Sequence, residues 1–355
     1  MSKYHPLREL YLTRIREFWR QPARIFWVYG FPTILAIVLG LAFKSQKPQK
    51  ATVLLIEAPG GEAVRAALGA DVAREGAAWR PGIAYVELPR EKAMYELETG
   101  KAPLVIEPST TGALSYHYDP TRPEAVTARA AVDEAIQRAR GRRDSVAVRD
   151  VEVTKPGSRY IDFLIPGLIA LNTMGGGLWG IGFMLVNFRI AGLLKRFAAT
   201  PMPRRDFLAA MLGARLTFLL PDVLVLLLLG VLAFQMPIRG SLLLLTLVEV
   251  VGALAFAGIG LLVASRAKTT ETVSGLMNLV MIPMWLLSGV FFSTKYYPEP
   301  MQWLIQALPL TQLCNGLRLI VLEGAGLPAL VPALAILTAW AVATFFLALR
   351  VFRWT

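Results

Sequence analysis

The sequence predicts a polytopic α-helical membrane protein with an α/β extracytoplasmic domain inserted between its first and second transmembrane helices. Of its 355 residues, 55% are hydrophobic and only 17% are charged, whereas soluble chains are about 45–50% apolar and about 25% charged. The apolar residues lie in long blocks within 25–43 and 160–351, while residues 44–159 have the mixed composition of a soluble domain. These observations indicate a membrane protein with one water-soluble insert.

The charge distribution supports the same division. The net charge is +12, yet residues 44–159 hold 18 basic and 16 acidic side chains, so the basic excess borders the membrane segments. A nucleic-acid-binding protein would concentrate that excess on its soluble part, and we therefore expect no nucleic-acid partner. The single Cys314 excludes an internal disulfide and a thiolate metal cluster, and His5 and His117 are too far apart in sequence to suggest a metal site.

Residues 1–24 are expected to form a cytoplasmic amphipathic leader. Their apolar side chains recur at helical spacing with arginines between them, which is typical of a helix that lies in the membrane surface. The apolar positions are Leu7, Leu10, Tyr11, Ile15, Phe18 and Trp19, and the basic ones are Arg8, Arg14, Arg16 and Arg20. A solvated leader that runs into the first span is the alternative, and Pro22 would bend the chain into the bilayer.

Six segments have the roughly 20 apolar residues that a bilayer core requires. They are 25–43, 161–186, 207–234, 241–264, 272–292 and 329–349. The first lacks an A-x-A-like site and is expected to be an uncleaved anchor, not a signal peptide. The last five form a membrane domain over 160–355. Within it, the proline-punctuated stretch 294–318 is expected to be re-entrant or interfacial, with Trp303, Leu304, Leu308 and Leu313 at the interface.

Basic residues in the short loops set the orientation. They gather in the leader, in the loop after the second span, in the loop after the fourth span and in the tail. With six spans, these four segments all lie on one side of the membrane. Both termini are then cytoplasmic, and residues 44–159 face outward.

The insert reads as a small α/β domain. Strands are expected at 51–56, 83–88, 103–106, 113–118 and 146–153, and helices at 62–68, 91–99 and 123–140. In the last helix, small and branched apolar residues fall on one face. Because strands and helices alternate, and because 116 residues can support a core, we expect an independent α/β fold.

Three charged side chains lie inside the apolar segments, where each costs on the order of a few kcal/mol. Arg215 and Asp222 are seven residues apart and therefore share a face of the third span, and Glu249 lies near the middle of the fourth. They line a translocation or proton path, or they pair within the bundle and fix helix register. A fourth, Asp162, is at the start of the second span and is expected to be structural.

Glycines cluster in the second span. Gly176 and Gly180 fit the small-xxx-small pattern, which lets two helices approach closely. Because such pairs are common in membrane helices, a packing role and a background match are both open.

The loop 188–206, between the second and third spans, is too polar to cross the membrane and too apolar for a fully solvated connecting loop. Leu193, Leu194, Phe197 and Ala198 form an apolar stripe at helical spacing, flanked by cations. A stiff turn at Pro201 would end this short helix. A lipid-surface helix with snorkelling cations is one interpretation. A lever that docks in a groove of an ATPase is the other.

Catalytic and nucleotide-binding motifs do not occur in the sequence. It has no G-x-x-x-x-G-K-[ST] loop, no G-x-S-x-G elbow, no H-E-x-x-H and no C-x-x-C. We therefore expect no enzymatic activity and no bound cofactor.

Two stretches carry a resemblance. The run G-x-L-K-R-x-x-A-T-P-x-x-R-x-x-F-L extends from Gly192 to Leu208, after a span that contains Pro166-Gly167. Later come L-S-G-x-F-F from Leu287, P-x-x-x-Q from Pro298, P-L-T from Pro309, and Arg318. The chain resembles ABC transporter permeases of the type-2 exporter family. It departs from the family's acidic E-R-E-x-G pattern at residues 187–191, so an acidic contact to the partner cannot be carried over.

The resemblance implies the permease subunit of an exporter in the cell (inner) membrane. Such a subunit dimerises with itself or with a homologous permease. It couples to separate ATP-binding subunits, which hold ATP and Mg, and moves drugs, lipids or polysaccharides outward. Membrane lipid and a periplasmic adaptor protein are the further partners. The residues expected to couple to the ATPase are Gly192, Leu193, Leu194, Lys195, Arg196, Phe197, Thr200, Pro201, Arg204 and Arg205. The alternative is a membrane-anchored receptor or envelope-assembly factor that transports nothing and acts through its outer domain.

Overall fold

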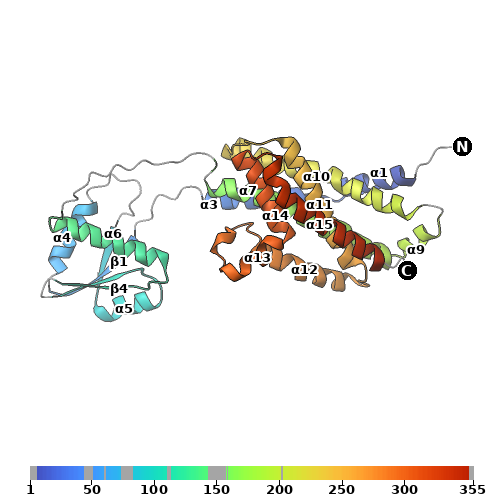
Figure 1. Ribbon diagram of the computed structural model, residues 1–355. Coiled ribbons are helices and arrows are strands. Elements are labelled where there is room, and N and C mark those ends of the chain that lie inside the picture. The colour runs from blue at the N-terminus through green and yellow to red at the C-terminus, as the bar shows by residue number, and fades with distance from the viewer. Residues whose placement is uncertain are drawn as a thin grey trace. The chain divides into compact units, whose positions relative to one another are not determined.

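The computed structural model describes residues 6–43, 51–59, 61–72, 83–109, 113–142, 157, 159–200 and 203–351 (Figure 1). The chain divides into two compact units, which are described separately. The helical unit comprises Met1–Lys44 and Val153–Thr355, and the α/β unit comprises Ser45–Glu152. The structure is therefore mostly helical with one α/β region, as the sequence predicts.

The helical unit contains α-helices and three π-helical turns. In its N-terminal part these are α1 (Pro6–Trp19), α2 (Pro22–Ile25), η1 (Phe26–Gly30) and α3 (Phe31–Ala42). The next elements are α7 (Tyr160–Gly177), η2 (Leu178–Phe183), α8 (Met184–Ile190), α9 (Leu193–Ala198), α10 (Arg204–Phe234) and α11 (Leu242–Ala264). The last are α12 (Thr270–Leu287), the short 3-10 turn η3 (Thr294–Tyr296), α13 (Glu299–Ala307), α14 (Pro309–Arg318), η4 (Leu319–Glu323) and α15 (Leu327–Val351).

Six helices of the described chain are long and apolar enough to cross a membrane, which confirms the expected number. They are Pro22–Ala42, Tyr160–Ile190, Asp206–Phe234, Leu242–Ala264, Thr270–Leu287 and Leu327–Val351. A seventh candidate is the pair Glu299–Ala307 and Pro309–Glu323, bent by 86°. It contains most of the proline-punctuated stretch 294–318. Trp303 there is exposed, but Leu313 is fully buried in the core and is therefore not interfacial as expected.

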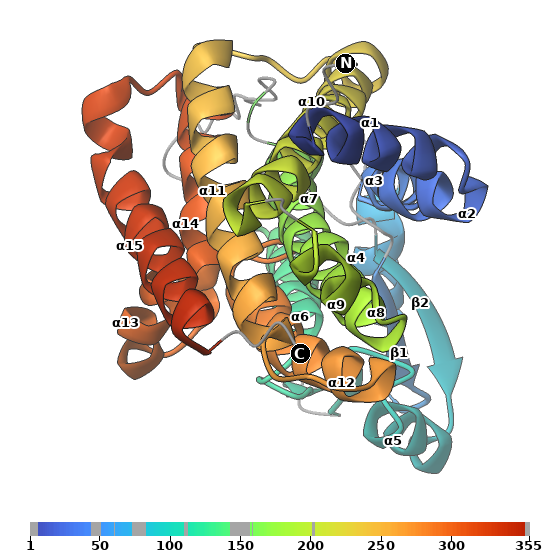
Figure 2. The ribbon, with the colours of Figure 1, turned by 90° about the vertical axis from the view of Figure 1, so that its right-hand side faces the viewer.

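The core of the helical unit surrounds α11, which packs against α7, η2, α14 and α15 (Figure 2). Glycines permit the closest approach. A Cβ at Gly177 would lie 2.5 Å from the Phe256 Cβ, and one at Gly182 would lie 2.7 Å from the Gly260 carbonyl oxygen. The tight backbone contact thus uses Gly177 and Gly182, and differs from the expected contact through Gly176 and Gly180.

Helix α1 packs against α10 along one of its faces (Figure 2). Phe18 is buried and stacks on Phe218 with ring centroids 4.1 Å apart, and the Tyr11 and Thr217 hydroxyls are 2.7 Å apart. Trp19 remains exposed. Part of the apolar stripe of α1 is thus occupied by protein, and the remainder is free to contact lipid.

The α/β unit is a four-stranded sheet in the order β2-β1-β3-β4. Its elements are β1 (Ala51–Ile56), α4 (Gly61–Val72), β2 (Ile83–Leu88), α5 (Arg90–Glu98), β3 (Val105–Pro108), β4 (Leu114–His117) and α6 (Pro123–Ala139). β1 pairs in parallel with β2 and β3, and β4 is antiparallel to β3. The strand expected at 146–153 lies outside the described residues.

Both faces of the sheet are covered, which explains the uninterrupted apolar run of β1. Val53 and Leu55 pack in a cluster with α4 and α6, whereas Leu54 and Ile56 pack with α5. This unit therefore has an apolar core of its own.

Candidate functional site

The loop between the second and third candidate spans forms a helical turn, as its residue pattern predicts. Gly192 adopts φ +68° between α8 and α9, a conformation that glycine accepts without strain. α9 follows with six residues, Leu193–Ala198, and contacts α8. Pro201 lies outside the described residues, as do the side chains of Arg204 and Arg205.

The apolar side of α9 faces the protein's own core. Leu194 is fully buried, and the Phe197 ring lies 6.1 Å from the Phe188 ring and 5.4 Å from the Phe207 ring. Leu193 is half-buried, while Lys195, Arg196 and Thr200 are exposed. Leu194 and Phe197 are therefore not free to enter a groove of a partner, as the lever interpretation expected, because the bundle already contacts them. The Ala198 side chain lies outside the described residues. The surface that remains for a partner is polar and cationic.

Helix α1 contacts the same aromatic group. The Arg14 guanidinium lies 4.3 Å from the centroid of the Phe188 ring and 2.5 Å from the Glu17 carboxylate. Burial lowers the pKa of Arg14 from its ordinary value, and Glu17 partly offsets this effect. α1, α8, α9 and the start of α10 thus form one packed cluster.

Arg189 ties the end of α8 to the end of α11. Its guanidinium donates hydrogen bonds to the carbonyls of Ala264, Ser265 and Ala267, at 2.9, 3.0 and 2.6 Å. Carbonyls at a helix C-terminus lack partners within the helix and attract cations. In the sequence, this position was notable only for lacking the family's acidic residues.

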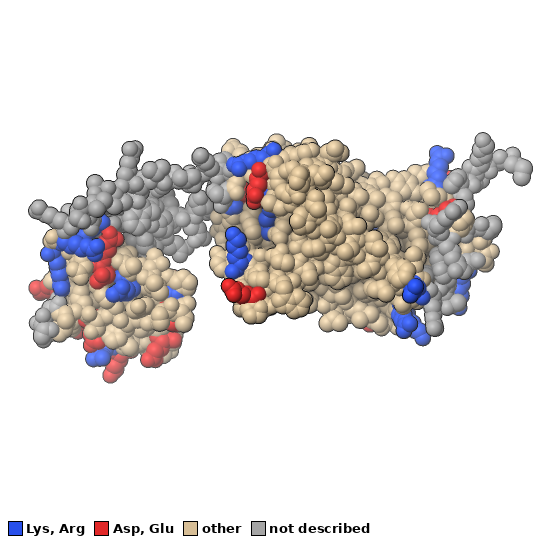
Figure 3. Space-filling view, viewed as in Figure 1, with Lys and Arg blue, Asp and Glu red and all other residues tan. Residues whose placement is uncertain are grey.

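Cations gather at the end of the helical unit that carries α9. Lys195 and Arg196 of α9 and Arg266 and Lys268 of the α11–α12 loop are exposed. Figure 3 shows Lys and Arg atoms at this end. Because Arg189 holds that loop against α8, the two cationic segments belong to one connected part of the fold.

The charged residues inside the apolar helices come together. The Arg215 guanidinium donates to the Asp222 carboxylate at 2.9 Å, and the Thr173 hydroxyl donates to Glu249 Oε2 at 2.7 Å. All four side chains are buried. The Arg215 guanidinium occupies the space where a side chain at residue 176 would lie. Gly176 therefore makes room for this charged side chain and not for the backbone of a neighbouring helix.

Several atoms of this buried cluster have no hydrogen-bond partner among the described residues. They are Arg215 Nε and Nη2, Glu249 Oε1 and, apart from the interaction between the Tyr29 hydroxyl and the Asp222 carboxylate, Asp222 Oδ1 and the Tyr29 hydroxyl. Such atoms are costly in an apolar interior unless water or a bound group reaches them. The cluster therefore has the unused hydrogen-bonding capacity of a site.

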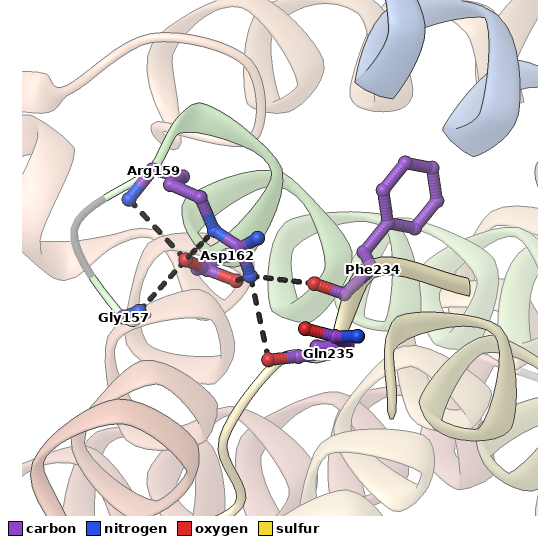
Figure 4. Close-up of polar contacts among 5 residues, drawn as sticks. All are labelled: Gly157, Arg159, Asp162, Phe234 and Gln235. Atoms are coloured by element: carbon purple, nitrogen blue, oxygen red, sulfur yellow. Dashed lines mark hydrogen bonds and ion pairs between the residues drawn. The ribbon is translucent and has the colours of Figure 1, made fainter. Parts of the chain in front are cut away.

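At the first turn of α7, Arg159 and Asp162 form a satisfied network (Figure 4). Asp162 is buried and accepts hydrogen bonds from the Gly157 and Arg159 backbone and from the Arg159 guanidinium. The same guanidinium donates to the Phe234 carbonyl at 2.7 Å, at the end of α10. The hydrogen bonds with Asp162 raise the pKa of Arg159. This arrangement joins two helix ends and suits the structural role expected for Asp162.

Arg318, part of the late motif, has a comparable role. Its guanidinium donates to the Phe163, Gly289 and Val290 carbonyls and lies 3.5 Å from the centroid of the Phe163 ring. It thereby links α14 to the start of α7 and to the turn after α12. Within the described parts of the chain, no group of three or more His, Cys, Asp or Glu side chains could hold a metal ion.

The chain has relatives among known proteins. It is 32% identical over 174 residues to "ABC transporter G family member 20" of Dictyostelium discoideum, covering 48% of this chain and 24% of that protein. It is 26% identical over 172 residues to "Probable multidrug ABC transporter permease YbhR" of Escherichia coli (strain K12), covering 48% and 47%. It is 32% identical over 100 residues to "Linearmycin resistance permease protein LnrN" of Bacillus subtilis (strain 168), covering 28% of this chain and 26% of that protein.

In each of these three cases the matched part is less than half the length of the relative. The family model described as "ABC-2 family transporter protein" matches residues 89–350, which is well over half of this chain. That match includes the α9 turn, the buried charged cluster and the late motif. The chain therefore belongs to the ABC-2 family of transporter proteins and is a multi-pass ABC transporter permease.

Proposed function

We propose that the protein is the permease subunit of an ABC exporter and moves an amphiphilic substrate out of the cytoplasm. In this proposal it dimerises, with itself or with a homologous permease, and ATP and Mg bind to separate ATP-binding subunits. Membership of the ABC-2 family supports this, as do the names of two relatives, one a probable multidrug permease and one a linearmycin resistance permease. The permease chain itself catalyses no reaction.

The proposed topology follows the distribution of basic residues. Residues 1–24 form the cytoplasmic leader, 25–43 the first span, 44–159 an extracytoplasmic α/β domain and 160–355 the remaining membrane domain. Both termini then lie on the cytoplasmic side of the inner membrane. The exposed cations of α9 and of the α11–α12 loop fall on that side as well, where an ATP-binding subunit would be.

The observation that carries the coupling proposal is the two-sided character of α9. Leu194 and Phe197 anchor the helix in the permease core, and Lys195 and Arg196 are exposed. An acidic surface of the ATP-binding subunit would pair with these cations. Its movement would reach α1, α8 and α10 through the ring contacts of Phe197 and Phe188. The exposed side of α9 would contact the ATP-binding subunit, and its buried side would pass the movement of that subunit to the membrane helices.

Co-purification tests this proposal. The full chain, tagged and extracted from membranes of its source in mild detergent, should retain an ATP-binding cassette protein that can be identified by mass spectrometry. The double variant Lys195→Glu, Arg196→Glu should release that protein, because charge reversal on the exposed face replaces attraction by repulsion.

Lys295→Glu is the matched control, because Lys295 is also exposed but lies in the turn after α12. It should keep the ATP-binding protein bound. Retention by the double variant at the parental level would exclude the cationic face as the contact. Absence of any ATP-binding protein from the parental sample would argue against the permease function itself.

A further inference from the structure

The buried cluster of the helical unit contains charges that do not balance. Arg215 and Asp222 of α10 form an ion pair, and Glu249 of α11 lies within electrostatic range of both. If all three were ionised, the cluster would carry one net negative charge in the interior. Two carboxylates therefore share a single guanidinium, which is already bonded to Asp222.

Glu249 is poorly supplied with partners for an ionised group. Its side chain is fully buried, Oε2 accepts one hydrogen bond from Thr173, and Oε1 has no partner. Burying an ionised carboxylate without a bound cation costs several kcal/mol, and proteins usually avoid this by neutralising the group. A protonated carboxyl fits the observed contacts better, with Oε2 as the carbonyl oxygen and the proton on Oε1.

The surroundings of Glu249 offer no second cation within the described residues. The ionisable groups that face it are Arg215, Asp222 and, from α14, the buried thiol of Cys314. The other ionisable residues on helices packed against α11 lie in a first or last helical turn. They are Tyr160, Asp162, Arg189, Arg204, Arg205, Asp206, Glu271, Arg318, Glu323 and Arg350.

We propose that Glu249 is a proton-binding site, with Arg215 and Asp222 as the ion pair that sets its charge. In the conformation described here, Glu249 holds one proton taken up from solvent. It releases the proton when α10 moves relative to α11 and the Arg215 guanidinium leaves Asp222 for Glu249. The site goes beyond the proposed export function and does not depend on it, because it can be tested on the permease alone.

Infrared difference spectroscopy of the full chain in lipid nanodiscs at neutral pH tests the proposal. The parental protein should show the carbonyl stretching band of a protonated carboxyl, and Glu249→Gln should lack it. Asp222→Asn should lack the band as well, although Glu249 is present, because the freed Arg215 then ionises Glu249. Glu323→Gln is the matched control at an exposed carboxyl and should leave the band unchanged.

Thr173→Val provides an independent measurement that preserves side-chain shape. Loss of the hydroxyl that donates to Oε2 should move the band to higher frequency without abolishing it. The proposal is overturned if the parental protein lacks the band, if Glu249→Gln retains it, or if the band of the Thr173→Val variant is unmoved. If Glu249→Gln does not fold, the band position in Thr173→Val decides alone.

Discussion

The α/β unit and the helical unit use ion pairs in opposite ways. In the α/β unit, Arg65 pairs with Glu87 and Arg90 with Glu107, and both arginines are solvent-exposed. In the helical unit, Arg215 and Asp222 pair with almost no exposure. An exposed pair of this kind contributes about 0–1 kcal/mol, whereas removing one member of a buried pair costs about 3–5 kcal/mol.

Polar residues thus contribute to the stability of the helical unit, whereas the ion pairs of the α/β unit lie on its surface and contribute little. The α/β unit is stabilised by two apolar clusters, one on each face of its sheet. In the helical unit, apolar side chains are equally favourable in the core and in the surrounding lipid. Their burial therefore contributes less to the free-energy difference between native and loosened packing. Buried and partly buried arginines bonded to carbonyls and carboxylates therefore fix the helices relative to one another.

The largest expected effect is at Asp222. Asp222→Ala should lower the free energy of unfolding in detergent by up to about 3–5 kcal/mol, because it breaks the buried ion pair and leaves Arg215 only Glu249, which must then give up its proton. Thermal unfolding monitored by circular dichroism measures this loss. The double variant Arg215→Met, Asp222→Leu should recover most of it. A single variant as stable as the parent would contradict a structural role for the pair.

A smaller effect is expected at Phe197. Phe197→Ala removes a half-buried ring from its contacts with Phe188 and Phe207 and should cost about 2 kcal/mol, less than a fully buried phenylalanine. Phe197→Leu keeps most of the packing and serves as the control. Coupling of ATP hydrolysis to transport in proteoliposomes should fall in the alanine variant, and equal coupling in both variants would argue against α9 as a transmitter.

The smallest effect on stability at neutral pH is expected for the exposed Arg90–Glu107 pair of the α/β unit. Arg90→Ala should change local stability by less than about 1 kcal/mol, because water solvates both partners. Amide hydrogen exchange of β3 and β4 in the full chain would measure it. A loss as large as that of Asp222→Ala would mean that the two units do not differ in the way described.

Tyr116 gives the same unit a dependence on alkaline pH. Burial, and then the Asp133 carboxylate 3.3 Å away, raise the pKa of Tyr116 to about 12. Since the folded-state pKa is raised above the ordinary value of about 10, this contribution is complete below pH 10 and is lost as the pH rises through 12. Tyr116→Phe should lower stability at pH 7 by no more than the hydrogen bond to Asp133, about 1 kcal/mol, and should flatten the decline in stability between those values. An unchanged alkaline decline would exclude Tyr116 as its source.

The sequence predicts those parts of the fold that have a repeating signal. Apolar blocks of span length give the six candidate helices, and short runs rich in apolar and β-branched residues give the strands of the sheet. The strand expected at 103–106 begins two residues later, at Val105, where its pairing with Leu54 of β1 starts. Register with a distant strand is a tertiary property that no local pattern encodes.

The partners of the partly buried arginines Arg189 and Arg318 were not predictable. Arg189 and Arg318 bind backbone carbonyls, and every residue carries a carbonyl, so the acceptors leave no trace in the residue pattern. The spacing of Arg215 and Asp222 did place them on one face of a helix. The direction of the α9 stripe could not be read either, because a stripe that docks on a partner and one that docks on its own bundle have the same periodicity.

The π-helical turn η2 divides the second candidate span into two pieces. A π turn holds more residues per turn than an α-helix and interrupts its hydrogen-bond ladder, and such turns are common sites of bending. Thr173 of the buried cluster lies on the α7 side of η2, and Phe188 and Arg189 lie on the α8 side. Although this span is continuous in sequence, η2 gives it a hinge. A force applied at α9 can therefore rotate α8 while α7 stays packed against α11.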